Sequence, residues 1–322
     1  MDTFELAGFI KPGQDDLKRL EWRGMIEFLG SPVFREISAK SRADILISLE
    51  DFDYVNADGL IWIMVLGDLL KAKGNSLWLQ LPRDQHLLKQ LKSSNFCDIA
   101  GSIFSFTNLY LLDEIPETRT LIGVAFSRID LTSLRFLLPK IRNFLLVDLP
   151  KRLGTTPHGE FGFEYLQPFV STISETSKNV VQHSRKEEDS GWGYLIISEI
   201  KQRHSSQFRF CIADAGQGFL SSLLSKGLKV SDDLDAIRHA LMFRYHMKGG
   251  EGLFRTVMFT SQLNGFINIH SGSARASLDL RHTRLRTQDE TRKFIETNLR
   301  VLKEGFYFPG VQIQLDVRGP GV

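Results

Sequence analysis

The amino-acid sequence predicts an α/β protein with two domains, and three observations support this prediction. The chain has 322 residues, enough for two hydrophobic cores. In its first third, short apolar segments alternate with amphipathic ones, which is typical of a parallel sheet covered by helices. In its second half, a helical segment with a polar stripe precedes a β-rich segment and two glycine-rich loops. We therefore expect one domain around each pattern.

A βαβα unit is expected in the first domain. The apolar runs 43–49 and 76–81 predict buried strands. The segments 57–74 and 85–95 repeat apolar residues at helical spacing, and Gly74 is the expected C-cap of the first of these helices. Helices that alternate with strands in this way favour a parallel sheet.

The middle of the chain, residues 105–159, is expected to connect the two domains. It contains a predicted strand at 120–126 and a long amphipathic helix at 131–149. This helix could be a connector, a dimerisation helix or the first part of the second domain. The segment 154–159 has the composition of a turn and is the expected linker.

Three polar residues of the next helical segment, Glu175, Asn179 and His183, are spaced four apart. An α-helix repeats every 3.6 residues, so their side chains share one face. A carboxylate, a carboxamide and an imidazole in one row can bind a cation and its phosphates, although a solvated helix face would have the same pattern. The opposite face is apolar, with Val170, Ile173, Val180 and Val181.

A second polar position follows a predicted strand at 207–213, which ends on Asp214. Gly216 and Gly218 then permit backbone torsions and close approaches that a Cβ would prevent. A carboxylate at a strand end beside two glycines can accept a hydrogen bond from the amino group of a ligand. An ordinary glycine turn is the alternative interpretation.

A glycine-rich loop at 248–253 leads into a predicted helix at 254–262. Free backbone N–H groups and the helix dipole at such an N-terminus bind phosphate. The loop lacks the Gly-Lys-Ser/Thr of a Walker loop, and no strand leads directly into it as in a dinucleotide-binding fingerprint. Lys248 could contact a phosphate there or be a solvated loop residue.

Together and in this order, the three elements resemble the N-box, G1 box and G2 box of the GHKL ATPase superfamily. The version Glu-x-x-x-Asn-x-x-x-His is most similar to that of the anti-sigma-factor serine kinases. The resemblance implies a second domain at 160–322 with an α/β-sandwich (Bergerat) fold that binds ATP and Mg²⁺.

The resemblance also implies roles for individual residues. Asn179 would bind Mg²⁺, Glu175 would act as base on an attacking water or hydroxyl, and Asp214 would accept from the adenine amino group. The segment 219–247, with a helix at 233–243, would form the ATP lid. The other expected ATP-binding residues are Gly216, Gly218, Lys248, Gly250, Gly252 and Leu253.

The sequence departs from this family near its last strand, at 309–315. The family has Gly-Thr there, whereas this chain has Gly310-Val311 and lacks the hydroxyl that helps to bind adenine. No phospho-acceptor histidine box is present, since His158 lies in a loop-like segment, and this excludes a self-contained two-component histidine kinase. We interpret His183 as a residue that caps or packs at its helix end.

The junction 54–60 resembles the phosphorylation loop of STAS domains, the anti-sigma antagonist fold, which implies a STAS-like domain within residues 1–104. The Asp-Ser-Ser-Gly of that family is replaced by Asn56-Ala57-Asp58-Gly59, so the serine switch cannot work at this position. Asp58 could mimic a permanent phosphate charge, or it could be an ordinary first-turn acid that stabilises its helix.

Composition narrows the expected environment and partners. The net charge is +2 with acidic and basic residues well mixed, which gives no strong electrostatic case for a nucleic-acid partner. The longest apolar run, 60–66, is far too short to span a membrane, and no signal peptide opens the chain. Cys97 and Cys211 lie in apolar settings and are expected to be reduced core residues. We therefore expect a cytoplasmic protein.

Two classes of function remain open. In the first, the protein is an Mg-ATP-binding regulator that resembles anti-sigma-factor serine kinases and has slow ATPase or protein phosphotransferase activity, with Glu175 as base. In the second, ATP orders a docking or dimerisation surface with little or no catalysis. In both, a protein partner is expected to dock through the STAS-like domain, and a homodimer is compatible with the sequence.

Overall fold

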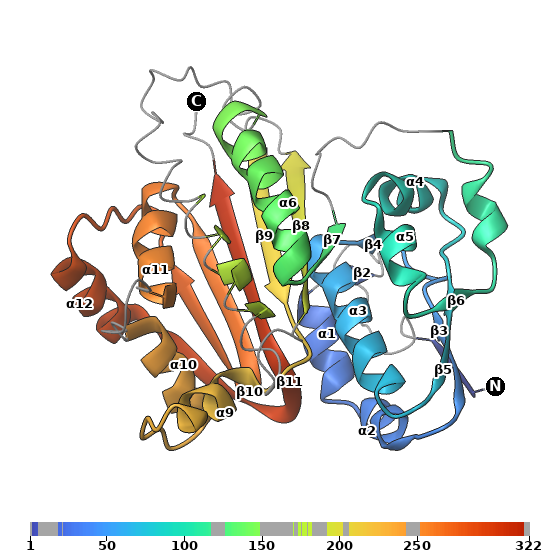
Figure 1. Ribbon diagram of the computed structural model, residues 1–322, viewed down its shortest axis with the longest axis horizontal. Helices are drawn as coiled ribbons and strands as arrows, with labels where there is room; N and C mark the ends of the chain where they lie inside the picture. Colours follow the sequence, from blue (N-terminus) through green and yellow to red (C-terminus); the bar gives the residue numbers. More distant parts are fainter. Residues whose placement is uncertain are drawn as a thin grey trace. The chain divides into compact units, whose positions relative to one another are not determined.

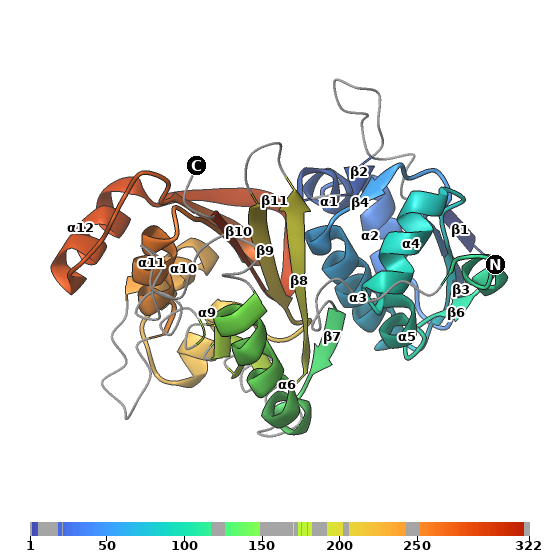
Figure 2. The ribbon, with the colours of Figure 1, turned by 90° about the horizontal axis from the view of Figure 1, so that it is seen from above.

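In a computed structural model, the chain divides into two compact units, Met1–Ser127 and Arg128–Val322 (Figures 1 and 2). The division falls inside the segment 105–159 that the sequence predicts to be a connector. One unit contains a parallel sheet and the other an antiparallel one, so the fold is mixed α/β. The structure describes residues 2–5, 19–20, 22–116, 126–148, 170, 173–174, 176–178, 180–181, 192–201, 206–242 and 252–318.

The first unit is built on a parallel sheet with the strand order β1-β3-β5-β6. The strands predicted at 43–49 and 76–81 are confirmed as β3 (Asp44–Ser48) and β5 (Ser76–Gln80). The outer strands are β1 (Asp2–Glu5) and β6 (Ser105–Phe106), and a separate short pair consists of β2 (Arg19–Leu20) and β4 (Tyr54–Val55).

The helices of the first unit include the two of the predicted βαβα unit, α3 (Ala57–Lys71) and α4 (Gln85–Ser93). The prediction of Gly74 as the C-cap of α3 is wrong, because the helix ends at Lys71 and Ala72 is its cap. Gly74 lies in the following turn with φ +78°, and its N–H donates to the Lys71 carbonyl at 2.9 Å. The other helices described here are α1 (Trp22–Leu29), α2 (Pro32–Ala39), α5 (Phe96–Ala100) and the 3₁₀ turn η2 (Leu109–Leu112).

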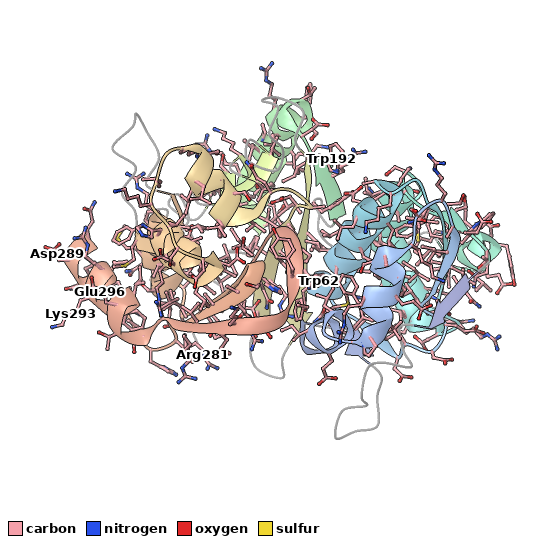
Figure 3. All side chains as sticks on the ribbon, turned by 90° about the horizontal axis from the view of Figure 1, so that it is seen from below. Trp62, Trp192, Arg281, Asp289, Lys293 and Glu296 are labelled. Atoms are coloured by element: carbon pink, nitrogen blue, oxygen red, sulfur yellow. The ribbon has the colours of Figure 1, made fainter. Side chains whose placement is uncertain are left out.

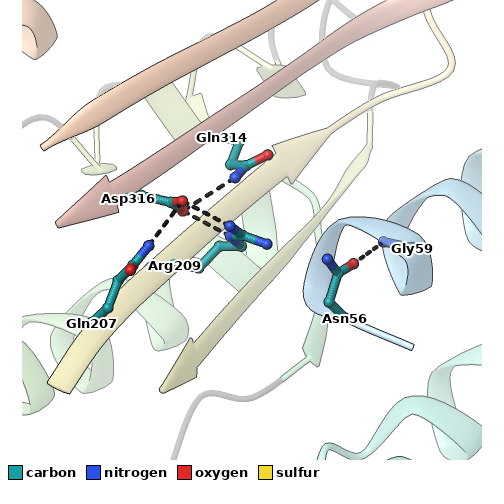
Figure 4. A network of polar contacts seen from close by, with 6 residues as sticks. All are labelled: Asn56, Gly59, Gln207, Arg209, Gln314 and Asp316. Atoms are coloured by element: carbon teal, nitrogen blue, oxygen red, sulfur yellow. Dashed lines mark hydrogen bonds and ion pairs between the residues drawn. The ribbon is translucent and has the colours of Figure 1, made fainter. Parts of the chain in front are cut away.

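Helix α3 is buried along most of its length, and its start is fixed by local contacts. Trp62 is 1% exposed (Figure 3). Asn56 caps the helix, since its side chain accepts a hydrogen bond from the Gly59 N–H at 3.1 Å (Figure 4). A Cβ at Gly59 would lie 2.4 Å from the Leu20 carbonyl oxygen. The junction 54–60 therefore requires glycine at this position.

Asn75 connects three backbone groups of the first unit. Its Oδ1 accepts from the Ala43 N–H at 2.9 Å, and its Nδ2 donates to the carbonyls of Lys40 at 3.2 Å and Leu70 at 2.9 Å. Asn75 is 6% exposed, so these hydrogen bonds are largely shielded from water. The side chain thus joins the end of α3 to the segments that precede β3 and β5.

We expect Asn75→Ala to lower the free energy of unfolding by on the order of 2–3 kcal/mol, because it leaves buried backbone groups without partners. Urea denaturation of the whole chain measures this loss. Asn298→Ala is the control, because the Asn298 side chain is exposed and donates one bond, to the Phe294 carbonyl at 3.0 Å. The loss of stability in Asn298→Ala should stay below about 0.5 kcal/mol, and equal losses of stability in the two variants would contradict the prediction.

The second unit is built on a sheet with the strand order β10-β11-β9-β8-β7. The pairs β8–β9, β9–β11 and β11–β10 are antiparallel. The strand predicted at 207–213 is confirmed as β9 (Ser206–Ala213), whereas the strand near 309–315 is longer than expected and forms β11 (Arg300–Arg318). The other strands are β7 (Phe126–Ile129), β8 (Gly193–Lys201) and β10 (Phe266–Asp279).

Helices α6, α9, α10 and α11 lie on one face of this sheet (Figures 1 and 2). The helix predicted at 233–243 is confirmed as α10 (Asp233–Met242). The helix predicted at 254–262 is confirmed as α11 (Gly252–Gln262), which begins two residues earlier than expected. The others are α6 (Leu131–Asn143), α9 (Gly218–Ser225) and α12 (Gln288–Asn298).

The helix predicted at 131–149 is shorter than expected, because α6 ends at Asn143 and a π-helical turn, η3 (Phe144–Asp148), follows it. Phe144 of this turn packs edge-on against Phe208 of β9, with ring centroids 6.0 Å apart. This contact places the turn in the core of the second unit. The predicted linker 154–159 and the predicted strand 120–126, apart from Phe126 in β7, lie outside the described residues.

The two faces of the antiparallel sheet differ in character. The face that contacts η3 carries apolar side chains such as Phe208, whereas the other face carries a polar network centred on Asp316 (Figure 4). The Asp316 carboxylate accepts from Arg209 Nε and Nη2, both at 2.7 Å, from Gln207 Nε2 at 3.0 Å and from Gln314 Nε2 at 3.2 Å. Because Arg209 lies opposite Asp316, this network stabilises the register of β9 against β11.

The two cysteines are core residues, as the sequence predicts. Cys97 of the first unit and Cys211 of the second are buried and form no disulfide. Burial raises the pKa of the Cys97 thiol to about 12, so this thiol stays protonated at neutral pH. Across the described part of the chain, no helix has the length and apolar character needed to cross a bilayer.

Candidate functional site

The residues predicted to form a site fall into two groups. Those outside the described residues are Glu175, Asn179, His183, Lys248 and Gly250. The structure describes the other five, and it brings Asp214, Gly218 and Leu253 together at one cavity of the second unit. The remaining two lie directly beside members of this trio, Gly216 next to the Asp214 carboxyl and Gly252 next to Leu253 in the chain.

This cavity lies where the end of β9 and the middle of β11 meet helices α9 and α11, and it holds about 60 Å³. Its described apolar lining residues are Val180, Phe219, Leu253, Val311 and Ile313. Its described polar side chains are those of Thr176, Asp214 and Ser222. An apolar lining with a few polar groups is the usual composition of small-molecule sites.

Asp214 is the acidic group of the cavity and follows directly on the last residue of β9. It is 3% exposed, its N–H donates to the Val311 carbonyl at 3.0 Å, and its Oδ1 accepts from the Gly216 N–H at 2.7 Å. Burial raises the pKa of the Asp214 carboxyl to about 7, although the backbone groups of Gly216 and Val311 act in the opposite direction. A carboxyl group with such a pKa, in a cavity, is a candidate for ligand binding.

The turn after Asp214 is tied to strand β10. Gly218 has φ +72°, a left-handed conformation that favours glycine, and a Cβ there would lie 3.0 Å from Ser271 Oγ. The same Ser271 hydroxyl oxygen accepts from the Phe219 N–H at 2.9 Å. The start of α9, which lines the cavity, is therefore held against β10.

Strand β11 approaches the Asp214 turn more closely than a larger residue would allow. Gly310 has φ +95°, and a Cβ at this position would lie 2.0 Å from the Asp214 carbonyl oxygen and 2.8 Å from the Gly216 nitrogen. The next residue, Val311, lines the cavity, as expected for a residue near the base pocket, and it presents no hydroxyl. Gly310 thus allows β11 to support the backbone that carries the carboxyl group.

Two helical residues of the segment 170–181, Thr176 and Val180, contribute to another wall of the cavity. Ile173 and Val181 are buried, as the apolar stripe predicts, whereas Val170 is half-buried. Val180 is buried too, and together with Thr176, one turn earlier, it lines the cavity. The face next to the predicted polar row therefore borders the same cavity as Asp214.

Helix α11 begins at Gly252, and its second residue, Leu253, lines the cavity. The first N–H groups of a helix have no partner within the helix and carry partial positive charge. An anionic group bound at this end of the cavity would therefore be stabilised by the N-terminus of α11.

The predicted lid, 219–247, contains α9 and α10, both attached to one irregular region of β10. There the register against β11 shifts between Ser271 and Ala274. Asp233, the first residue of α10, accepts through Oδ2 from the Ser273 N–H at 2.8 Å and from its hydroxyl at 2.9 Å. Since Ser271 holds the start of α9, two residues of one strand that are separated only by Gly272 anchor both helices of the lid.

The sequence prediction missed several residues of the cavity wall. Thr176 and Val180 each directly follow a predicted site residue, Glu175 and Asn179, and are likewise four residues apart. This spacing could have identified them as neighbours of the site. Ser222 lies one helical turn after Gly218, but α9 itself was not predicted.

Comparisons of the chain with models of protein families and with curated proteins find no match. In the ranges that the structure describes, no cluster of three or more His, Cys, Asp or Glu side chains could hold a metal ion.

Proposed function

We propose that this cavity binds the adenine ring of ATP and that the protein is an Mg-ATP-binding regulator of the GHKL type, similar to the anti-sigma-factor serine kinases. The observation that carries this proposal is the buried carboxyl group of Asp214 at a strand end, in a narrow apolar cavity. The cavity also contains Gly218 and Leu253, which the order of the sequence motifs independently assigns to the same ligand.

The chemistry of the cavity suits an aminopurine. Apolar walls pack against a flat ring, and an ionised Asp214 can accept a hydrogen bond from an exocyclic amino group. A guanine would place a carbonyl oxygen at the same position, opposite the carboxylate. The N-terminus of α11 at Gly252 would stabilise the phosphates.

Mg²⁺ belongs to the proposal through Asn179, whose amide oxygen would help to hold the ion, and the ion would supply positive charge beside the phosphates. Glu175, one helical turn earlier in the sequence, would accept a proton from the attacking water or hydroxyl. With these roles, the protein would have slow ATPase or protein phosphotransferase activity.

A second function, a nucleotide-gated interaction switch with little catalysis, is favoured by the size of the cavity. Its volume of about 60 Å³ is well below the roughly 300–1,000 Å³ of ligand pockets, so the wall must move to admit a base. Phe219 and Ser222 of α9 belong to this wall and to the predicted lid. Binding would therefore shift α9 and alter the surface that a partner contacts.

The first unit is proposed to be a STAS-like domain that docks a protein partner. Its parallel sheet and the capped junction at Asn56 support this proposal. Asp58, at the position of the family's phosphorylated serine, lies in the first turn of α3 and is 0% exposed. A kinase could not reach a position so deeply buried without local opening, which supports a docking domain that does not switch by phosphorylation.

ATP with Mg²⁺ is expected to stabilise the protein, and GTP to do so much less. A ligand at about 100 times its dissociation constant adds about 2.7 kcal/mol of stability. A thermal-shift series with ATP, ADP and GTP, each with and without Mg²⁺, measures the effect. The absence of a shift with every adenine nucleotide would exclude the proposed function.

Two variants, assayed with the same nucleotides, distinguish the enzyme from the interaction switch. Glu175→Ala is expected to keep ATP binding and to lose turnover by about 10²–10⁴-fold, the usual contribution of a general base. Asn179→Ala is the companion variant, and it should lose the Mg²⁺-dependent part of ATP stabilisation. Equal turnover by Glu175→Ala and the parent would favour the interaction switch.

A further inference from the structure

We infer that the hydrogen bond from the Phe219 N–H to the Ser271 hydroxyl is an autoinhibitory contact, which holds helix α9 over the cavity and opposes the entry of nucleotide. This inference rests on the proposed function, because it concerns access to the same cavity. It gives a regulatory role to Ser271, a residue of β10 that is not among the described lining residues.

The autoinhibitory contact joins two walls of the cavity. Phe219 lines the cavity from α9, and Ser271 pairs with Val311, which lines it from β11. Ser271 is 1% exposed, and its Oγ accepts from the Phe219 N–H at 2.9 Å. The wall formed by α9 therefore cannot move away from β10 without breaking this hydrogen bond.

The two helices of the predicted lid are held to β10 unequally. Asp233 of α10 accepts from the Ser273 N–H at 2.8 Å and from its hydroxyl at 2.9 Å. The Asp233 carboxylate also fills the space above Gly272, where a Cβ would lie 2.2 Å from Oδ1. Among the described residues, α9 has one side-chain hydrogen bond to β10, the uncharged one at Ser271. Because hydrogen bonds to a carboxylate are roughly twice as strong as neutral ones, α9 should leave β10 more readily than α10 does.

The segment between the two helices can absorb such a movement. The described residues 226–232 belong to neither α9 nor α10, and they are exposed or half-buried. A Cβ at Gly227 would meet nothing within 4 Å, so no packed neighbour opposes a change of chain direction there. Helix α9 can therefore rotate while α10 keeps its place.

The closed position of α9 lowers the apparent affinity for nucleotide. The cavity of about 60 Å³ is too small for a base, so nucleotide binds the fraction of molecules in which α9 has moved. The apparent dissociation constant is the intrinsic one divided by this fraction. After α9 has moved, the Phe219 N–H can bond to water, so the Ser271 hydroxyl stabilises only the closed state. Removal of this hydroxyl should increase the open fraction.

Ser271→Ala tests the inference, because it removes the hydroxyl and adds no bulk. We expect this variant to bind ATP about 3–10-fold more tightly than the parent, the usual effect of one neutral hydrogen bond. The gain should come from faster association, with dissociation unchanged. Stopped-flow fluorescence with a ribose-labelled ATP and Mg²⁺ measures both rates. A serine with a purely structural role would give weaker binding when removed, so unchanged or weaker ATP binding overturns the inference.

Ser225→Ala is the matched control on the same helix. The Ser225 hydroxyl donates to the Ser222 carbonyl at 2.9 Å, a bond that stays inside α9. The control should leave both rates at the values of the parent. Equal acceleration of association in the two variants would overturn the inference, because it would show a general loosening of α9.

Hydrogen exchange of the parent without nucleotide tests the unequal anchoring of the two helices and needs no variant. After correction for intrinsic rates, the Phe219 amide should exchange at least about 10-fold faster than the Ser273 amide, which donates to the Asp233 carboxylate. Equal protection of the two amides would overturn the inference, even if Ser271→Ala fails to fold. Faster exchange at Phe219 in a parent that binds no adenine nucleotide would instead exclude the proposed function.

Discussion

Asp214→Asn is expected to weaken ATP binding by roughly 100-fold and, at the same time, to stabilise the free protein above neutral pH. The asparagine oxygen can still accept from the Gly216 N–H, which Asp214 now bonds at 2.7 Å. Its amide N–H groups, however, would face the amino group that the carboxylate is proposed to bind. A substitution that improves stability and removes binding is the signature of a functional residue.

The stability gain follows from the pKa of Asp214. Burial raises this pKa to about 7, from about 3.9 in an unfolded chain. Between these values the folded state holds a proton that the unfolded state has lost, so the stability contributed by this group falls as pH rises from about 4 to about 7. The difference between the two pKa values corresponds to a stability loss of roughly 4 kcal/mol at most. Asparagine does not ionise, so the variant has no such loss.

Urea denaturation of the parent and of Asp214→Asn at pH 5 and pH 8 measures this effect. Carboxyl groups with a lowered pKa, such as those of Asp130 and Asp279, titrate in both proteins, so the difference between parent and variant isolates Asp214. The variant should gain stability relative to the parent between the two pH values. If the difference in stability between parent and variant is the same at pH 5 and pH 8, or if the variant binds ATP as tightly as the parent, Asp214 does not have the proposed role.

Gly310→Ala is expected to cost about 3–5 kcal/mol of stability and to abolish nucleotide binding. The residue has φ +95°, and the new Cβ would lie 2.0 Å from the Asp214 carbonyl oxygen, a contact that side-chain rotation cannot relieve. The backbone must move, and the Asp214 turn moves with it. Denaturation curves and a nucleotide titration of the folded fraction measure both losses.

Strand β11 offers a matched control in Gly305. A Cβ at this exposed position would meet nothing within 4 Å. Gly305→Ala should therefore leave stability within about 0.5 kcal/mol of the parent and leave ATP binding unchanged. Similar behaviour of the two alanine variants would show that the close approach of Gly310 to Asp214 is unimportant.

Strong periodicity made much of the fold predictable. The strands β3, β5 and β9 and the helices α3, α4, α10 and α11 arise from patterns that local sequence specifies. Helix α12 was missed, although Thr287 and Glu290 form a capping box that signals its start. The central place of β11, between β10 and β9, depends on long-range pairing that no local pattern encodes.

The site was predictable where its chemistry depends on residue type and spacing. Asp214 and Gly218 were identified in this way, since a strand followed by an acid and glycines is visible in the sequence. Thr176 was not identified, because its importance comes from its place in the cavity wall, which forms only in the folded chain. Gly310 likewise acquires its role from the closeness of Asp214, about one hundred residues away in the sequence.

Because both native cysteines are buried, cysteines introduced at the surface can be labelled selectively with fluorescent dyes. Cys97, with a pKa of about 12, and Cys211, with no exposed surface, should resist maleimide reagents while the protein is folded. Cysteines introduced at the exposed positions Lys89 and Lys293, one in each unit, would therefore react selectively. Energy transfer between two dyes at these positions would report directly whether nucleotide changes the distance between the units.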